Sequence, residues 1–237
     1  MPDAAVLLER PPAAPPTSSP PPVERVLRAL HCHGERARTA ACWAHPSWLA
    51  VPLGIDTAAA AEVQHALRGC APQAVQACSA ELLRHWRVEP IDLSVLAASA
   101  RRPAAAAALL SLVPESTGLR MLRMRALLGH LDRLRRTIDR VARERLSAAL
   151  GLPLAEFLVR AAAAARPTAS QGIGPMDDES LAGTGWRALA PASNGLCALA
   201  LPRALACAPA EGADAALDAS WAALLPEFFP EWTWLFG

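Results

Sequence analysis

Apolar residues recur every three or four positions along much of this chain, which is the spacing of amphipathic helices. The longest such segment covers residues 116–150 and ends before Gly151, a residue type that commonly terminates helices. Wound as one helix, the segment gathers a single apolar side from Met124, Leu127, Leu131, Leu134, Ile138, Val141, Ala142, Leu146 and Ala149. The pattern therefore predicts one continuous helix of roughly 50 Å, at about 1.5 Å per residue.

The opposite side of this predicted helix carries arginines, namely Arg125, Arg133, Arg136, Arg140 and Arg143. Such a run of charge ordinarily forms a solvated face. Two functional interpretations stay open beside that one: a docking face for an acidic protein and a nucleic-acid-binding face. Nucleic acid is disfavoured because no aromatic residues are interleaved for base stacking. Arg133, Arg136, Arg140 and Arg143 are therefore candidate protein-binding residues.

Shorter segments predict further helices, with boundaries marked by proline, glycine and aspartate. They cover residues 23–33, 56–70, 72–86, 92–100, 103–113, 153–166 and 213–225. Gly34 is placed to end the first, Asp56 is the N-cap of the second, and Pro72 lies in the first turn of the third. We expect the segments 56–70 and 72–86 to form a helical hairpin, and residues 42–49 to form a loop. Alternate leucines in residues 196–201 predict one short strand.

Composition shifts divide the chain into four parts. Residues 1–22 hold eight prolines among Ala, Ser and Thr, which predicts a disordered arm. Residues 23–166 form the expected helical domain, and residues 167–180 contain a Gly/Pro/Ser-rich stretch that is typical of a linker. We expect residues 181–237 to form a small C-terminal subdomain that packs on the helical domain.

The composition favours a mainly α fold. Much of the 53% apolar content is alanine, tyrosine is absent, and β-branched residues are scarce, so the chain offers little material for sheets. We expect an irregular multi-helix bundle with a disordered proline-rich N-terminal arm and at most one or two short strands in the C-terminal part.

Charge is balanced overall but unevenly distributed. The net charge is +1, and all 23 basic residues are arginine, a bias typical of GC-rich bacterial genomes. Residues 119–146 contain nine arginines and three acids, whereas residues 151–237 contain four arginines and nine acids. The balanced total provides no general attraction to nucleic acid or to anionic lipid.

The chain reads as a cytosolic protein. Residues 1–10 lack a charged leader and apolar core, and no stretch approaches the roughly 18 apolar residues of a membrane span. We therefore expect no direct membrane insertion. The six cysteines are expected to be reduced.

One cluster of residues could carry chemistry: His31, Cys32, His33, Cys42 and His45. Cys42 and His45 have a two-residue gap used in zinc sites, but the other spacings are irregular and no second pair follows. No Gly-x-Ser-x-Gly elbow or complete phosphate-binding loop is present either. We therefore expect no metal, no cofactor and no enzymatic activity.

Aromatic residues are concentrated at the C-terminus, in Trp232, Trp234 and Phe236. A terminus frays unless it is tied down, so these rings are expected to be covered. Packing within the chain is favoured over a partner site, because an exposed cluster of this kind promotes aggregation. The partner site stays open, so Trp232, Trp234 and Phe236 are candidate protein-binding residues as well.

Several motifs together carry a resemblance to a known family. The stretch Ala40-Ala-Cys-Trp-Ala-His-Pro-Ser-Trp-Leu-Ala-Val-Pro resembles the aromatic-x-His-Pro-Ser-x-Leu-x-x-Pro motif of the SctK/YscK family, and includes His45, Pro46, Ser47 and Leu49. Leu109-Leu-Ser-Leu-Val-Pro, Arg120-Met-Leu-Arg-Met-Arg and the Trp-Leu-Phe-Gly ending are similar to later parts of that family, in the same order.

The resemblance implies a cytosolic accessory protein of a bacterial type III secretion system of the Hrp type. Such a protein would be an adaptor of the sorting platform that bridges the inner-membrane ring protein (SctD-type) to the pod protein (SctQ-type), peripheral to the membrane through protein contacts. The motif around His45 implies packing, with His45 and Pro46 shaping a turn. The alternative is an arginine-rich helical regulator that binds nucleic acid or acts as a chaperone-like partner, and an enzyme using the Cys/His cluster is the third class.

Overall fold

The computed structural model describes residues 22–86, 88, 91, 106–164, 178–189, 205 and 215–236. Every regular element in these ranges is helical, and they contain no strand, which confirms the predicted mainly α class. Residues 1–21 of the expected arm, the expected helix 92–100, residues 167–177 of the expected linker and the expected strand 196–201 lie outside the described residues.

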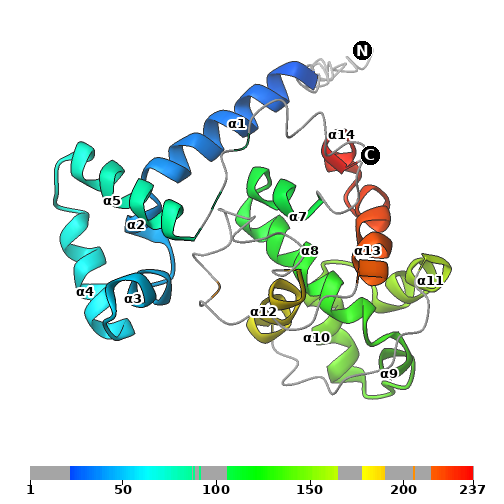
Figure 1. Ribbon diagram of the computed structural model, residues 1–237. Helices are drawn as coiled ribbons and strands as arrows, with labels where there is room; N and C mark the ends of the chain where they lie inside the picture. The colour runs from blue at the N-terminus through cyan, green and yellow to red at the C-terminus, as the bar shows by residue number, and fades with distance from the viewer. Residues whose placement is uncertain are drawn as a thin grey trace, which may run out of the picture.

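The N-terminal helices form one group, on the left in Figure 1. They are α1 (Pro22–Arg38), α2 (Ala40–Trp43), α3 (Ser47–Leu53), α4 (Thr57–Leu67) and α5 (Pro72–His85). Helices α4 and α5 pack chiefly on α2 and α3, and α5 also packs on α1. The helices α4 and α5 of the expected hairpin therefore pack mainly on other helices, because the short helices α2 and α3 supply the apolar surface that both cover.

Local sequence signals explain several boundaries in this group. The Asp56 carboxylate accepts a hydrogen bond of 2.8 Å from the backbone N–H of Ala59, as expected of an N-cap. Pro72 begins α5, where its missing N–H costs nothing. Gly54, with a φ of 64°, ends α3 in the left-handed region that glycine tolerates.

Two predictions for this group are wrong. Helix α1 does not end at Gly34 but continues to Arg38, where the Arg36 guanidinium donates to the carbonyls of Ser111 and Val113. Such tertiary contacts outweigh the cost of glycine inside a helix, about 1 kcal/mol. Residues 42–49 belong largely to α2 and α3 instead of forming a loop.

The remaining helices surround a central helix, α8 (Glu115–Leu128). The others are α7 (Ala106–Leu109), η2 (Leu110–Leu112), α9 (Leu131–Arg135), α10 (Arg140–Leu150), α11 (Leu154–Ala164), α12 (Asp178–Leu189), α13 (Ala215–Phe228), η4 (Pro230–Trp232) and α14 (Thr233–Phe236). Helix α12 makes the most extensive contact with α8, and α10 and α13 cover further sides of it. The packing thus joins the central segment of the chain to its C-terminal segment.

The expected continuous helix over residues 116–150 is wrong, because the segment is divided into α8, α9 and α10. The Thr137 hydroxyl donates to the Arg133 carbonyl at 3.2 Å, and the Asp139 carboxylate accepts from the Ala142 N–H at 2.9 Å. These side-chain bonds to the backbone compete with helix continuation and start a new helix. Ile138 and Val141, expected on the apolar side, are consequently 92% and 53% exposed. Gly151 ends α10 with a φ of 65°, as predicted.

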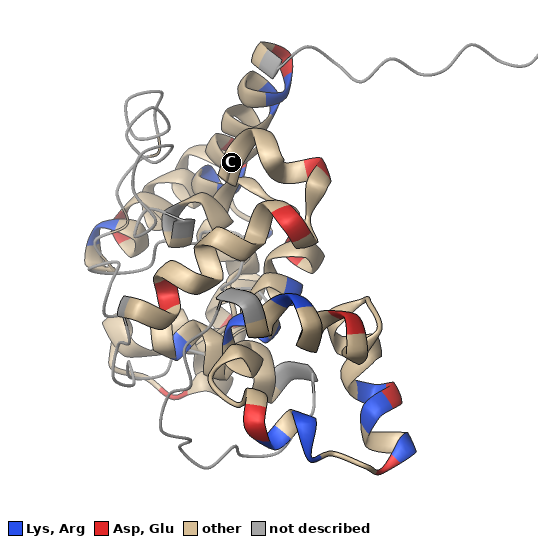
Figure 2. Cartoon of the chain, turned by 90° about the vertical axis from the view of Figure 1, so that its right-hand side faces the viewer, with Lys and Arg blue, Asp and Glu red and all other residues tan. Residues whose placement is uncertain are grey.

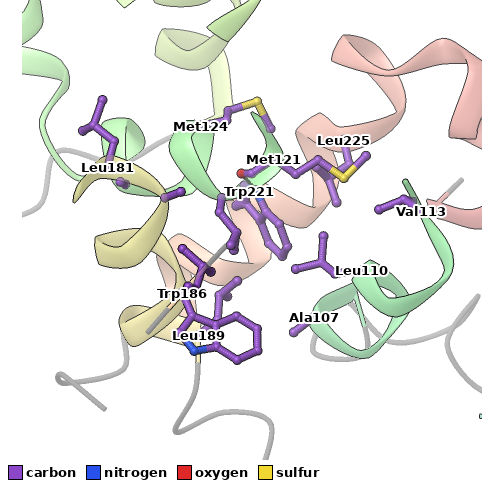
Figure 3. Close-up of a cluster of buried hydrophobic side chains, with 14 of the residues drawn as sticks. Ala107, Leu110, Val113, Met121, Met124, Leu181, Trp186, Leu189, Trp221 and Leu225 are labelled. Carbon is purple, nitrogen blue, oxygen red and sulfur yellow. Dashed lines mark hydrogen bonds between the residues drawn. The ribbon is translucent and has the colours of Figure 1, made fainter. Parts of the chain in front are cut away.

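The core around α8 is built on Trp221 of α13, which is 1% exposed. Its indole N–H donates to the carbonyl oxygen of Met121 at 2.9 Å. Figure 3 shows Trp221 beside Met121 and Leu225, with Trp186 and Leu189 of α12 on its other side. One aromatic side chain therefore joins the three helices α8, α12 and α13.

Helix α12 approaches the backbone of α8 closely at Gly185. A Cβ atom at this position would lie 2.1 Å from the carbonyl oxygen of Leu122. Real Cβ atoms do not approach a backbone oxygen so closely, so any larger residue must separate the two helices. The contact between α8 and α12 therefore requires glycine at position 185.

We predict that Gly185→Ala lowers the free energy of unfolding by about 2 kcal/mol or more, because overpacking a tight helix contact costs on the order of 1–3 kcal/mol and here the neighbour is backbone. Urea denaturation followed by far-UV circular dichroism measures the change.

Gly183→Ala is the matched control, two residues away in the same helix. A Cβ at Gly183 meets only the flexible end of Arg187, at 3.5 Å. We expect this variant to be as stable as the original protein or slightly more stable, because alanine favours helix over glycine by about 1 kcal/mol. Equal destabilisation by both substitutions would contradict the tight contact at Gly185.

Candidate protein-binding surfaces

The four candidate arginines of the basic segment lie at one corner of the molecule. Arg133, Arg136, Arg140 and Arg143 are all exposed, the first two in and after α9 and the others in α10. Figure 2 shows this corner at the lower right, where α9, residues 137–139 and α10 follow one another. Arg140 pairs with Glu144 at 2.8 Å. We call these four residues the arginine corner. They come from two helices and so do not share one straight helix face as expected.

Other arginines of the same segment connect helices within the fold. Arg125, expected on the exposed side, is 3% exposed and donates to the Asp218 carboxylate at 2.6 Å, joining α8 to α13. Arg120 donates to the Leu150 carbonyl at 3.0 Å and Arg123 to the Ala149 carbonyl at 3.4 Å. These two cations lie at the C-terminus of α10, where carbonyl groups lack helical partners.

The motif around His45 starts helix α3. The backbone N–H of Ser47 donates to Nδ1 of His45 at 3.3 Å, and the Ser47 hydroxyl lies 2.8 Å from the same atom. Pro46 is the residue before the helix, and Leu49 is buried in the core. His45, Pro46 and Ser47 thus lie at the start of α3, and Leu49 lies in the core.

Trp48 within this motif connects distant parts of the chain. Its indole N–H donates to the Leu205 carbonyl at 2.7 Å, and its own carbonyl accepts from the Trp86 indole at 3.0 Å. The rings of Trp48 and Trp86 meet edge to face at 4.9 Å. Sequence reasoning did not identify this contact, because no local pattern reports a partner 157 residues away.

The aromatic C-terminus packs against the rest of the chain. Leu235 is buried, whereas Trp232, Trp234 and Phe236 are half-buried against the core. The rings of Trp232 and Trp234 lie 5.8 Å apart. Helix α14 contacts α13 and α7. The chain itself thus covers part of each ring and leaves part of Trp232 and Trp234 accessible.

Surface hollows in the described part of the chain include the following two. The first, which we call the α1–tail groove, has a volume of about 380 Å³ and is lined by Arg25, Arg28, Ala29, Cys32, Arg36, Leu112, Pro114, Glu231, Trp232 and Trp234. The second, the α2–α5 groove, has a volume of about 410 Å³ and is lined mostly by apolar residues, including Leu49, Pro52, Leu53, Val63 and Leu67. Neither hollow was predicted, because each is formed by elements that only the fold brings together.

The residues of the Cys/His cluster have different surroundings. Burial and the neighbouring Arg36 lower the pKa of His33, so this buried imidazole is neutral at pH 7. Burial raises the pKa of the Cys42 thiol, which disfavours the nucleophilic thiolate. His31 and Cys32 are exposed on α1. In the described part of the chain, no three His, Cys, Asp or Glu side chains are grouped to hold a metal ion.

No helix in the described ranges has both the length and the hydrophobicity that a bilayer crossing requires.

A family model described as a bacterial type III secretion protein (HrpB4) matches residues 20–231 of the chain. No curated protein and no solved structure matches the chain.

We predict that removing the tail, residues 231–237, lowers the melting temperature and the solubility of the isolated protein. Burying one large apolar side chain contributes roughly 1.5–3 kcal/mol, and Leu235 alone is 6% exposed. Differential scanning calorimetry and ultracentrifugation measure the two effects. Glu231→Gln, which changes an exposed residue, is the control. Unchanged stability and solubility together with lost partner binding would instead identify the tail purely as a binding site.

We predict that Arg125→Met lowers the free energy of unfolding by about 3–5 kcal/mol, because it removes the Arg125 cation from the buried Asp218 carboxylate. The double substitution Arg125→Met/Asp218→Leu should recover much of this loss, since it removes both charges. Urea denaturation measures both variants, with the exposed Arg133→Met as the control. If the single and double variants are equally unstable, the two side chains are not energetically coupled.

Proposed function

We propose that this chain, which belongs to the HrpB4 family of bacterial type III secretion proteins, is a non-enzymatic adaptor of the secretion apparatus. In this proposal it bridges the inner-membrane ring protein (SctD-type) to the pod protein of the sorting platform (SctQ-type). It would lie in the cytosol, peripheral to the inner membrane through protein contacts only.

The observation that supports a bridging role best is the separation of two exposed surfaces. A bridge needs two contact surfaces that partners can occupy at the same time. The arginine corner on α9 and α10 lies at the bottom of Figure 1, whereas α1 and the C-terminal helix α14 lie at the top. Two partners bound at these surfaces would not compete for the same residues.

The arginine corner suits an acidic protein surface. Its four guanidinium groups are exposed, and the acids within residues 131–146 are Asp132, Asp139 and Glu144. Exposed charges of this kind steer association and give binding that weakens as salt rises. Asp139 caps α10 and Asp132 pairs with Arg135 at 2.9 Å, so these two carboxylates already have partners.

The alternative function, an arginine-rich regulator that binds nucleic acid, receives less support. Residues 131–146, which contain the corner arginines, include Leu134, Ile138 and Val141 but no Phe, Tyr or Trp on which a base could stack. Several arginines that would extend a basic track, such as Arg120 and Arg125, are engaged within the fold.

Co-purification with the SctD-type and SctQ-type proteins of the same secretion system tests the proposal. We expect the chain to bind both, separately and together. Charge reversal at the corner, Arg136→Glu/Arg143→Glu, should weaken one of these complexes about tenfold at low salt, chiefly through a slower association rate. Surface plasmon resonance at two salt concentrations measures the rates.

Arg84→Glu is the control, because this arginine is exposed on α5, away from both surfaces, and pairs with a glutamate three residues earlier. This control should bind like the original protein. Failure to bind either partner would refute the adaptor role, and recovery of nucleic acid alone would favour the alternative. Unaltered binding by the corner variant at low salt would show that the arginine corner is only a solvated surface.

A further inference from the structure

We propose that the α1–tail groove binds an acidic peptide segment of a partner protein, with an apolar side chain of that segment anchored on Trp232 and Trp234. This inference deepens the proposed function and rests on it for the existence of a protein partner. It assigns a chemical class of ligand to a surface that family membership leaves unassigned.

The shape of the groove suits a peptide side chain. Its volume of about 380 Å³ lies within the range of about 300–1,000 Å³ that is common for binding clefts. Leu112 and Pro114 contribute apolar lining, and the rings of Trp232 and Trp234, 5.8 Å apart, supply two aromatic surfaces. Both rings are held by the fold and remain partly accessible, so binding would require little ordering of the groove.

The charge of the lining selects an acidic ligand. Arg25, Arg28 and Arg36 come from one helix, α1, and Glu231 is the acidic residue in the lining. Arg36 is engaged by the carbonyls of Ser111 and Val113, so it holds α1 in place and adds positive charge. Arg28 pairs with Glu24 in an exposed i,i+4 contact, which contributes little stability and can give way to a carboxylate of a ligand.

The combination of tryptophan and arginine is typical of the residues that dominate binding energy in protein interfaces. A membrane surface fits the same residue types, but the rings and arginines here line a hollow between α1, η2 and the tail helices η4 and α14, whereas a bilayer needs a surface that protrudes. The chain's own residues 1–21 are another possible occupant, yet their charged residues are only Asp3, Glu9 and Arg10. The lining therefore favours an acidic segment of another protein.

Tiled 15-residue peptides covering the cytosolic parts of the SctD-type and SctQ-type proteins of the same system test the inference. The fluorescently labelled full chain is first tested for binding to each peptide. Each peptide that binds is then labelled itself, and its affinity for the unlabelled full chain is measured by fluorescence anisotropy. We expect at least one acidic peptide with an apolar residue to bind in a salt-sensitive manner. Arg25→Glu/Arg28→Glu should weaken that binding about tenfold or more.

A second variant, Cys32→Trp, narrows the groove without changing its charge, since Cys32 is exposed and lines the hollow. It should also abolish binding, even if the charge reversal disturbs α1. Arg136→Glu/Arg143→Glu, at the arginine corner, is the control and should bind the peptide normally. Melting temperatures within a few degrees of the original protein establish that each variant is folded.

Several outcomes would overturn the inference. One is that no acidic peptide binds, and another is that binding is unchanged in both groove variants. Sedimentation of the protein with phosphatidylglycerol vesicles, lost in the groove variants, would assign the groove to a lipid surface. Peptide binding that appears only after deletion of residues 2–20 would identify the arm as the occupant. If the full-length partners bind but no peptide binds through the groove, this inference fails while the proposed function stands. If peptides bind through the groove but the chain does not bridge the two partners, the proposed function fails while the groove remains a peptide-binding site.

Discussion

The close contact between α8 and α12 is the constraint on which much of this structure depends. With no side chain at Gly185, the carbonyl of Leu122 can touch the backbone of α12, and the tight approach lets Trp186 and Trp221 close over the middle of α8. Met121, Leu122, Leu127 and Leu128 are at most 2% exposed as a result. The C-terminal turns of α8 are enclosed in this way, with residues 124–128 all buried, so even the arginine at position 125 has an internal partner.

That enclosure determines which charges remain available for binding. Arg120, Arg123 and Arg125 of α8 are used for contacts with α10 and α13. The most exposed arginines of this segment lie on or beside α9 and α10, beyond the end of the central helix. The basic segment, whose arginines look alike in the sequence, is thus divided by the fold. The arginines of α8 hold helices together, and those of α9 and α10 can contact a partner.

The same packing produces the α1–tail groove. Helix α13 lies against α8 and leads into η4 and α14, which brings Trp232 and Trp234 opposite the arginines of α1. The covering of these rings within the chain agrees with the expectation from the sequence, where an aromatic terminus was expected to be packed. Their partial exposure beside three arginines was not expected, because nearly two hundred residues separate α1 from the tail.

The sequence by itself determined the helical class, the caps at Asp56, Pro72 and Gly151, and the family, because these depend on residues that are close together in the chain or on motifs in a fixed order. It also placed the candidate arginines on exposed positions. It did not reveal the breaks near residues 129 and 138, the continuation of α1 past Gly34, or the burial of Arg125. Those features depend on competition between local hydrogen bonds and contacts with distant helices. A periodic pattern contains no information about which distant helix will pack against a given segment. Only the tertiary structure decided them, and with them the two grooves, since a hollow between elements exists only once those elements have packed.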